Sequence, residues 1–290
     1  MTESKVLLTL VIPTYNEEKR LPITLETLAE WIPQSCFDVE VIIVDDGSKD
    51  RTKEIARSYA GKIGNLQFVE VPHVGQMNAT INGLKKSNRP LRATLEADCP
   101  VHPRALESFV KKFPDFDVVM GSRIVHDETS AVEGKPLYRR ILSFGMSRLF
   151  AILFKGGVRD PQIGFKLYHA RVLDRVLPLL TLRHDGLKSA EIIVKSVAFG
   201  FRVKEVPVQY KHDDDSRCVP KRSYGIVAAA AWALVELWAK SYVEYKRGDL
   251  PVCPVRFGFL LLPFWRLMTF PSLSAAGAGG TPSSLPLSAP

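Results

Sequence analysis

Two neighbouring carboxylates end a short apolar stretch of this chain. Residues 39–44 are rich in β-branched side chains, the pattern of a strand buried on both faces, and Asp45 and Asp46 follow directly. Parallel strands deliver their loops to one rim of an open sheet, where ligands bind and carboxylates can accept hydrogen bonds. Gly47 permits a sharp turn there, and the polar residues after it can cap a helix. An ordinary strand-to-helix turn would use the same residues, so these residues alone do not distinguish a ligand site from such a turn.

A second acidic pair, Glu96 and Asp98, follows a short strand-like segment at residues 92–95. Two carboxylates one residue apart at a strand end can converge on one cation, and Mg²⁺ or Mn²⁺ prefers such oxygen ligands. The alternative is an acidic loop that is only solvated.

These acids require a scaffold of alternating strands and helices. Apolar runs rich in β-branched residues predict strands, and apolar residues three or four apart predict helices. We expect strands at residues 6–13, 39–44, 66–71, 92–95, 118–123 and 202–210, and helices at about 21–32, 52–59, 77–84, 138–154 and 226–245. The alternation predicts an α/β fold with a mostly parallel, Rossmann-like sheet and helices on both faces.

Charge narrows the class of partner. The 290 residues carry a formal net charge of +8, which favours nucleotide phosphates, anionic lipid or nucleic acid as a partner. No motif that combines basic and aromatic residues supports nucleic acid, so we expect none. The four cysteines are scattered without metal-like spacing, which is typical of reduced thiols in a cytoplasmic protein.

Segments 11–17 and 44–50, in this order and at this spacing, resemble the nucleotide-sugar half of family 2 glycosyltransferases, which have the GT-A fold. The resemblance extends over about residues 8–223. It implies that Pro13 and Tyr15 wall the base and ribose while Glu17 and Asp46 accept hydrogen bonds from them. The full set of residues that it assigns to the nucleotide is Pro13, Tyr15, Glu17, Asp45, Asp46 and Ala97.

In that family an Asp-x-Asp motif binds Mg²⁺ or Mn²⁺, and Glu96-Ala97-Asp98 stands at its place. The resemblance therefore implies a metal held by Glu96 and Asp98. Glu96 departs from the motif but keeps the charge on a longer arm. Pro100 stands where a glutamine is frequent in the polyprenol-phosphate branch, so this position supplies no side-chain ligand. Residues 73–76 also depart from a common Asn-x-Gly-Lys segment, and we assign them no role.

Basic residues further along resemble the parts of lipid-phosphate transferases that contact phosphates. Arg139 and Ser143 are four residues apart and share one helix face. Ser216-Arg217 resembles a mobile Ser-Lys loop, and arginine binds phosphate through a bidentate fork. The catalytic residues that the resemblance implies are Asp98, Arg123, Arg139, Ser143 and Arg217. The alternative interpretation of each arginine is that it is only a solvated charge on the surface.

Two further acids match the family pattern. Asp160 opens an Asp-x-x-x-Gly-Phe segment that flanks the sugar in that family, so its carboxylate could bind a sugar hydroxyl. Glu191 matches the acid of the helix that follows.

The C-terminal part predicts association with a membrane surface. Residues 257–270 are strongly apolar but are broken by Pro263 and Arg266, and they are too short for a span of about 20 residues. We expect a glycosyltransferase domain at residues 1–225, a membrane-associating helical segment at 226–270 and a disordered tail at 271–290. The alternative for the middle segment is a helix packed on the sheet plus an arm that forms a homo-oligomer.

The implied reaction moves a hexose from GDP-mannose or UDP-glucose to a dolichyl or polyprenyl phosphate, with inversion, on the cytoplasmic side of a membrane. Its acceptor phosphate is already ionised, so no strong general base is required. Two alternatives stay open. One is a family 2 transferase with a glycan or soluble acceptor, and the other is a nucleotide-sugar binder without catalysis.

Overall fold

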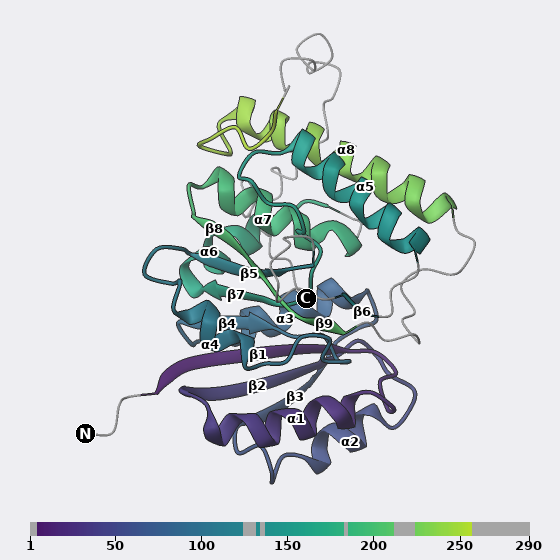
Figure 1. Cartoon of the computed structure of the whole chain (residues 1–290), viewed down its shortest axis with the longest axis vertical. Coiled ribbons are helices and arrows are strands. Elements are labelled where there is room, and N and C mark those ends of the chain that lie inside the picture. Colours follow the sequence, from purple (N-terminus) through teal and green to yellow (C-terminus); the bar gives the residue numbers. More distant parts are fainter. Residues whose placement is uncertain (1–4, 124–131, 134–136, 183–184, 212–223, 257–290) are drawn as a thin grey trace, which may run out of the picture. The chain divides into compact units, whose positions relative to one another are not determined.

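A seven-stranded sheet forms the centre of the fold (Figure 1). The structure is a computed structural model that describes residues 5–123, 132–133, 137–182, 185–211 and 224–256. These residues belong to one compact unit, Met1–Arg256, and a second unit, Phe257–Pro290, lies outside the described residues.

The strands of this sheet run in the order β3-β2-β1-β4-β7-β5-β8. All neighbours are parallel except β7, which is antiparallel to both β4 and β5. A separate two-stranded sheet pairs β6 with β9. The strands are β1 Val6–Thr14, β2 Phe37–Asp45, β3 Leu66–Glu70, β4 Leu91–Thr94, β5 Val118–Ser122, β6 Val132–Glu133, β7 Lys166–His169, β8 Val203–Pro207 and β9 Tyr210–Lys211. The predicted α/β class with a mostly parallel sheet, the GT-A architecture, is confirmed.

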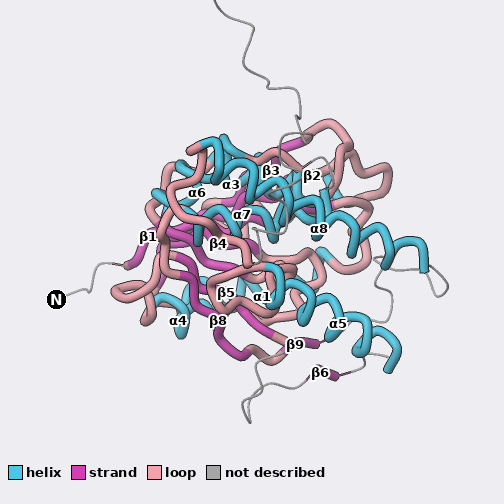
Figure 2. Tube along the Cα trace, turned by 90° about the horizontal axis from the view of Figure 1, so that it is seen from above, coloured by secondary structure: helices cyan, strands magenta, loops and turns pink. Residues whose placement is uncertain are grey.

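Helices cover both faces of the sheet. Figure 2 shows α3, α6 and α7 on one side of the strands and α1 and α4 on the other. The helices are α1 Leu21–Gln34, α2 Thr52–Ser58, α3 Gln76–Lys86, α4 Ala105–Val110, α5 Leu137–Leu153, α6 Ala170–Val176, α7 Lys188–Ala198 and α8 Tyr224–Arg247, with short 3-10 turns η1 Leu177–Leu179 and η2 Asp185–Leu187. Residues Leu21, Leu25 and Leu28 are fully buried, so the predicted apolar face of the first helix is confirmed.

Two features of the sheet were not predicted. Strand β7 carries the sequence Lys-Leu-Tyr-His, which is too short and too polar to be recognised as a buried strand. The strand expected at residues 202–210 is split, because Pro207 ends β8 and Tyr210 begins β9 beside β6.

Helices α5 and α8 lie side by side and pack on each other (Figure 1). Trp238 of α8 is buried and donates from Nε1 to the backbone oxygen of Arg256 at 2.7 Å, whereas Trp232 is 70% exposed. Within the described part of the chain, no helix combines the length and apolarity that crossing a membrane requires. The predicted boundary at residue 225 stays a prediction, although α8 packs against α7 in the same unit as the sheet.

Candidate active site

The predicted acids gather at one rim of the sheet. Strand β1 lies between β2 and β4, with Thr14 beside Asp45 and Val11 beside Thr94 in the parallel register. Because parallel strands end at the same edge, the loops after β1, β2 and β4 meet there. These are the loops that carry Tyr15, Asp46 and Glu96, respectively.

Asp45 holds the turn after β2. It is 4% exposed, accepts a hydrogen bond from the Ser48 N–H at 2.8 Å and one from the Thr14 hydroxyl at 3.2 Å. Gly47 in this turn has φ +81°, a conformation that glycine adopts without strain. The carboxylate of Asp45 therefore supports the loop from inside, and its assignment to the nucleotide stays a prediction.

Asp46 is 2% exposed and binds the loop that follows β3. Its Oδ1 accepts hydrogen bonds from the N–H groups of Val74 at 3.0 Å and Gly75 at 3.3 Å. Its Oδ2 lies 2.8 Å from Nδ1 of His73, whose ring stacks on the ring of Tyr15. The sequence did not assign a role to His73, yet the structure brings it together with two predicted nucleotide residues.

An arginine connects the first loop with the acidic motif. Arg20 donates two hydrogen bonds to the Glu17 carboxylate, at 2.6 and 2.5 Å, and also lies 3.9 Å from Oδ2 of Asp98. Ala97 between the two acids is buried, and its backbone oxygen accepts a hydrogen bond from the Thr24 hydroxyl at 2.6 Å. Helix α1 thus anchors the acidic loop at the rim.

The charges of Arg123 and Lys166 only partly offset the burial of the Glu96 carboxylate. Burial, together with the nearby charge of Asp98, raises the pKa of Glu96 to about 7. A cation between the two acids would remove this penalty. The described residues contain no cluster of three metal-binding side chains, but Mg²⁺ is commonly held by one or two carboxylates plus the oxygens of a substrate phosphate. The acid pair therefore fits the predicted metal, with substrate oxygens completing its coordination.

A buried ion pair lies beside the acids. Arg123 binds the Asp160 carboxylate at 2.8 and 2.7 Å through its guanidinium and at 3.1 Å through its backbone N–H. Burial would raise the pKa of Asp160, but the Arg123 guanidinium more than offsets burial, so the pKa lies below its ordinary value. The guanidinium also lies over the ring of Tyr210, which donates to Glu96 at 3.4 Å. Arg123 thus contacts protein groups on two sides, and its predicted contact with substrate stays a prediction.

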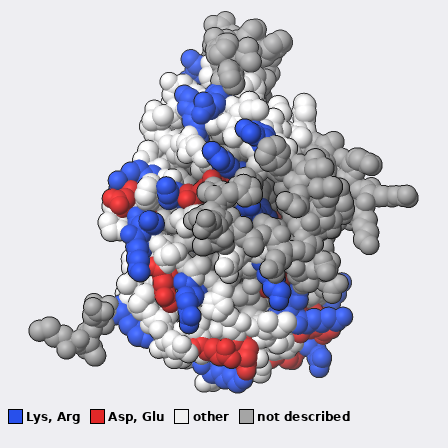
Figure 3. All heavy atoms as spheres, viewed as in Figure 1, with Lys and Arg blue, Asp and Glu red and all other residues white. Residues whose placement is uncertain are grey.

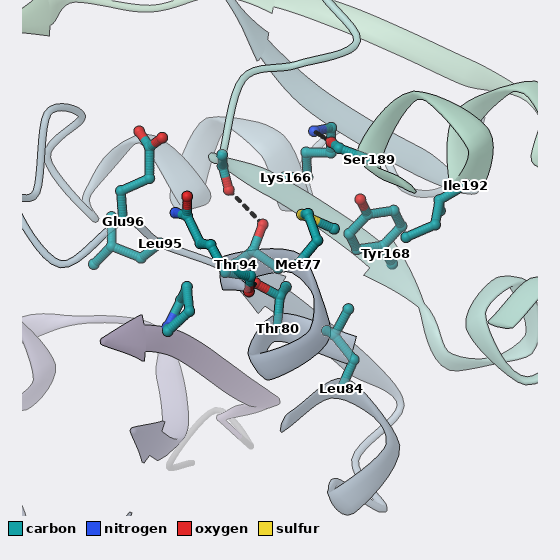
Figure 4. A pocket seen from close by; sticks show the side chains of 13 residues that line it. Met77, Thr80, Leu84, Thr94, Leu95, Glu96, Lys166, Tyr168, Ser189 and Ile192 are labelled. Atoms are coloured by element: carbon teal, nitrogen blue, oxygen red, sulfur yellow. Dashed lines mark hydrogen bonds between the residues drawn. The ribbon is translucent and has the colours of Figure 1, made fainter. Parts of the chain in front are cut away.

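A pocket opens behind the acids and contains a charged group that the sequence interpretation missed. Figure 4 shows Lys166 beside Ser189 on one side of this pocket and Glu96 on the other. The pocket has a cavity volume of about 30 Å³, room for little more than a water molecule, and is lined by residues that include Pro13, Met77 and Lys166. The buried Lys166 ammonium donates to the Ser189 hydroxyl at 2.6 Å, and burial lowers its pKa to about 8. Lys166 directly follows the Gly-Phe pair of the Asp-x-x-x-Gly-Phe segment, and this position in the sequence could have identified it as a candidate site residue.

A distant carboxylate caps the helix that forms one wall of this pocket. Asp185 accepts hydrogen bonds from the backbone N–H groups of Met77 at 2.8 Å and Asn78 at 2.9 Å, in the first turn of α3. A side chain at Gly75 would collide with this carboxylate at 2.4 Å, which explains the glycine. The cap joins α3 to the start of α7, so both pocket walls are fixed to each other.

Glu191, in contrast, lies away from the pocket surface. It is fully buried and accepts hydrogen bonds from the backbone of Thr181 at 2.6 Å and Leu182 at 3.1 Å, with Lys195 at 3.2 Å. These contacts make it a structural group of α7.

Three predicted phosphate contacts cannot be placed. The backbones of Arg139 and Ser143 belong to α5, but their side chains lie outside the described part of the structure. Arg217 lies outside the described residues altogether.

The fold and its acidic rim are those of a GT-A glycosyltransferase. Glycosyl transferase family 2 is recognised over residues 9–177, more than half of the chain. The chain therefore belongs to glycosyl transferase family 2, and it is a glycosyltransferase, as its motifs predicted.

Individual relatives are more specific. The chain is 34% identical to the dolichyl-phosphate beta-glucosyltransferase ALG5D of Trichomonas vaginalis over 250 residues, which are 81% of this chain and 76% of the relative. It is 31% identical to ALG5A of the same organism, over 74% of this chain and 68% of the relative. It is 28% identical to the human dolichyl-phosphate beta-glucosyltransferase, over 73% of this chain and 70% of the relative.

Solved structures agree on the fold. Glucosyl-3-phosphoglycerate synthase of M. tuberculosis, in complex with Mn²⁺, UDP-glucose and phosphoglyceric acid, matches with a TM-score of 0.57 and 15% identity, over 81% of this chain and 79% of that one. S. aureus TarS in complex with UDP-GlcNAc matches with a TM-score of 0.53 and 16% identity, over 81% and 71%. At these identities the likeness concerns the fold alone.

Proposed function

We propose that this enzyme transfers glucose from a nucleotide sugar to dolichyl phosphate or a related polyprenyl phosphate. The observation that carries the proposal is the identity of 34% to a dolichyl-phosphate beta-glucosyltransferase, which extends over 81% of this chain. It favours glucose over mannose, and hence UDP-glucose over GDP-mannose among the two predicted donors.

The rim offers separate groups to the nucleoside and to the diphosphate of the donor. The loops that carry Tyr15 and Asp46 offer an aromatic ring and a buried carboxylate to the nucleoside. Glu96 and Asp98 would hold Mg²⁺ or Mn²⁺, which neutralises charge on the diphosphate as the bond to the sugar breaks.

The acceptor phosphate attacks the anomeric carbon from the side opposite to the diphosphate, so the configuration inverts. A phosphate monoester is anionic at neutral pH, and positioning rather than proton removal is the main requirement. We propose Arg139, Ser143 and Arg217 as its contacts, because they resemble the phosphate-binding residues of the lipid-phosphate branch.

A lipid phosphate keeps its head group at a membrane surface, so the enzyme has to lie against one. Helices α5 and α8 expose Ile152 at 54% and Trp232 at 70%. Figure 3 shows lysine and arginine side chains where α8 ends, and the last turn of this helix carries Lys246 and Arg247. Apolar and aromatic side chains among basic ones favour the cytoplasmic face of a membrane with anionic lipid.

Truncation after Arg256, the last residue of the compact unit, tests how the enzyme reaches the membrane. We expect the shortened protein to become soluble and still glycosylate a short-chain polyprenyl phosphate. A truncated protein that still sediments with membranes would place the anchor elsewhere.

Transfer assays test the reaction itself. The full chain is incubated with Mn²⁺ and radiolabelled UDP-glucose or GDP-mannose, with dolichyl phosphate or 3-phosphoglycerate as acceptor, and products are partitioned between organic and aqueous phases. We expect label from UDP-glucose in the organic phase. Label found only in an aqueous product would assign a soluble acceptor, and donor binding without turnover on any acceptor would assign a non-catalytic binder.

A further inference from the structure

The imidazole ring of His73 fills the space between two groups that we assign to the nucleotide base. It stacks on the ring of Tyr15 with centroids 4.4 Å apart and planes inclined by 21°. Its Nδ1 lies 2.8 Å from Oδ2 of Asp46 and 2.8 Å from the backbone oxygen of the same residue. Both oxygens are acceptors, so Nδ1 carries the proton and donates to them.

These are the two kinds of contact that a nucleotide base makes. A base is a flat heteroaromatic ring that stacks on an aromatic side chain and donates ring N–H groups to a fixed acceptor. The imidazole is also a flat heteroaromatic ring with an N–H donor. It therefore satisfies Tyr15 and Asp46 in the way that a bound base would.

The His73 side chain can leave this place without disturbing the fold. Its side chain is 59% exposed, and so its departure opens no core. The backbone next to it stays anchored, because the N–H groups of Val74 and Gly75 bind the other carboxylate oxygen of Asp46. A rotation of the side chain therefore ends its stacking on Tyr15 while this backbone stays in place.

We propose that the imidazole of His73 takes the place of the base as long as no nucleotide is bound, and that an incoming nucleotide displaces it. The inference rests on the proposed nucleotide-sugar function. Because a base can bind only those molecules whose imidazole has moved away, the measured Kd equals the intrinsic Kd divided by the open fraction. A ratio of closed to open molecules of about ten gives a tenfold weaker Kd, which corresponds to about 1.4 kcal/mol.

This mechanism predicts for which ligands the affinity depends on His73. Every nucleotide has to displace the same ring, so UDP and GDP are weakened by the same factor. Inorganic pyrophosphate carries no base and binds through the metal and basic groups alone, so its affinity is independent of His73.

Calorimetric titration of the full chain with UDP, GDP and pyrophosphate, each with Mn²⁺, tests the proposal. We expect His73→Ala to bind both nucleotides about tenfold more tightly, and pyrophosphate within about twofold of the unmodified protein. His73→Asn removes the aromatic ring but keeps a polar side chain, and should show the same direction if His73→Ala does not fold. His169→Ala is the matched control, because His169 contacts the ring of Phe113 near the amino end of β4, at the opposite edge of the sheet.

The outcomes separate this inference from the function on which it rests. Unchanged or weaker nucleotide binding in His73→Ala, with normal lipid glycosylation, overturns the inference alone and makes His73 an ordinary loop residue or a direct base contact. Equal tightening of pyrophosphate also overturns it, because the effect would then be electrostatic. If the unmodified protein and both variants bind no nucleotide, the proposed donor site and the inference fail together.

Discussion

Replacing Arg123 by methionine removes the partner of the buried Asp160 carboxylate and should lower the free energy of unfolding. Asp160 is 3% exposed and receives three hydrogen bonds from Arg123, at 2.7, 2.8 and 3.1 Å. Leaving one member of a buried pair alone costs about 3–5 kcal/mol. The Arg123 side chain is 23% exposed, which places this pair near the lower end, at about 3 kcal/mol.

For a unit of this size, about 3 kcal/mol corresponds to a fall in Tm of roughly 6–12 °C. Thermal unfolding of Arg123→Met measures this fall, and adding Asp160→Asn should recover part of it because no unpaired charge then remains. Lys62→Met is the control, since Lys62 and Glu26 form an exposed pair of at most about 1 kcal/mol. If Arg123→Met melts within about 2 °C of the unmodified protein while turnover collapses, the guanidinium acts on substrate and the structural reasoning is wrong.

The same pair sets a dependence of stability on pH. Since the pKa of Asp160 is lower in the folded protein than its ordinary value of 3.8, its stabilising contribution is present above pH 3.8 and is lost as the pH falls further. In Arg123→Met this loss on acidification should disappear, which unfolding at stepwise lower pH would detect.

Three further predictions concern other acids of the site. Asp98→Ala should abolish metal-stimulated transfer with little change in Tm, and turnover that still responds to Mn²⁺ would contradict the metal assignment. Glu96 should destabilise the metal-free protein as the pH rises from 4.5 to about 7, because the folded state holds the proton of Glu96 more tightly than the unfolded state does. In the presence of EDTA, Glu96→Gln should therefore raise the free energy of unfolding by about 1–3 kcal/mol at pH 8 and leave it unchanged at pH 4. Asp185→Ala should lose about 1–2 kcal/mol through the cap of α3, measured by urea unfolding, and Asp185→Asn, which keeps one of the two acceptor oxygens, should lose less; an unchanged free energy of unfolding in Asp185→Ala would contradict the cap.

The sequence predicted the parts of this fold that depend on local patterns. Buried parallel strands such as β1 and β2 are continuous apolar runs and can therefore be recognised in the sequence. Because parallel strands end at the same edge of a sheet, the acids that follow these strands are expected at one rim. The helix at Leu21–Gln34 follows from apolar spacing in the same manner.

Pairings between distant segments could not be predicted in this way. Nothing in the residues around Asp160 indicates that its carboxylate meets Arg123 rather than a sugar hydroxyl. The contacts of Asp46 with the backbone of Val74 and the ring of His73 were not predicted either, and its contact with a nucleotide stays a prediction. Lys166 is charged and was therefore not expected in a buried strand, although its neighbours in space satisfy it. Such contacts are set by tertiary packing, which periodicity does not encode.

The antiparallel strand β7 has a consequence for synthesis of the chain on the ribosome. It lies between β4 and β5 but is translated about 70 residues after β4, which takes roughly 4–14 s at 5–20 residues per second. During that time the outer edge of β4 has no strand beside it, and β5 has no neighbour that links it to β1 and β2. Unpaired edges of this kind promote association with other chains. The edge of the nascent N-terminal half therefore stays open to such association until β7 arrives and joins the two halves of the sheet.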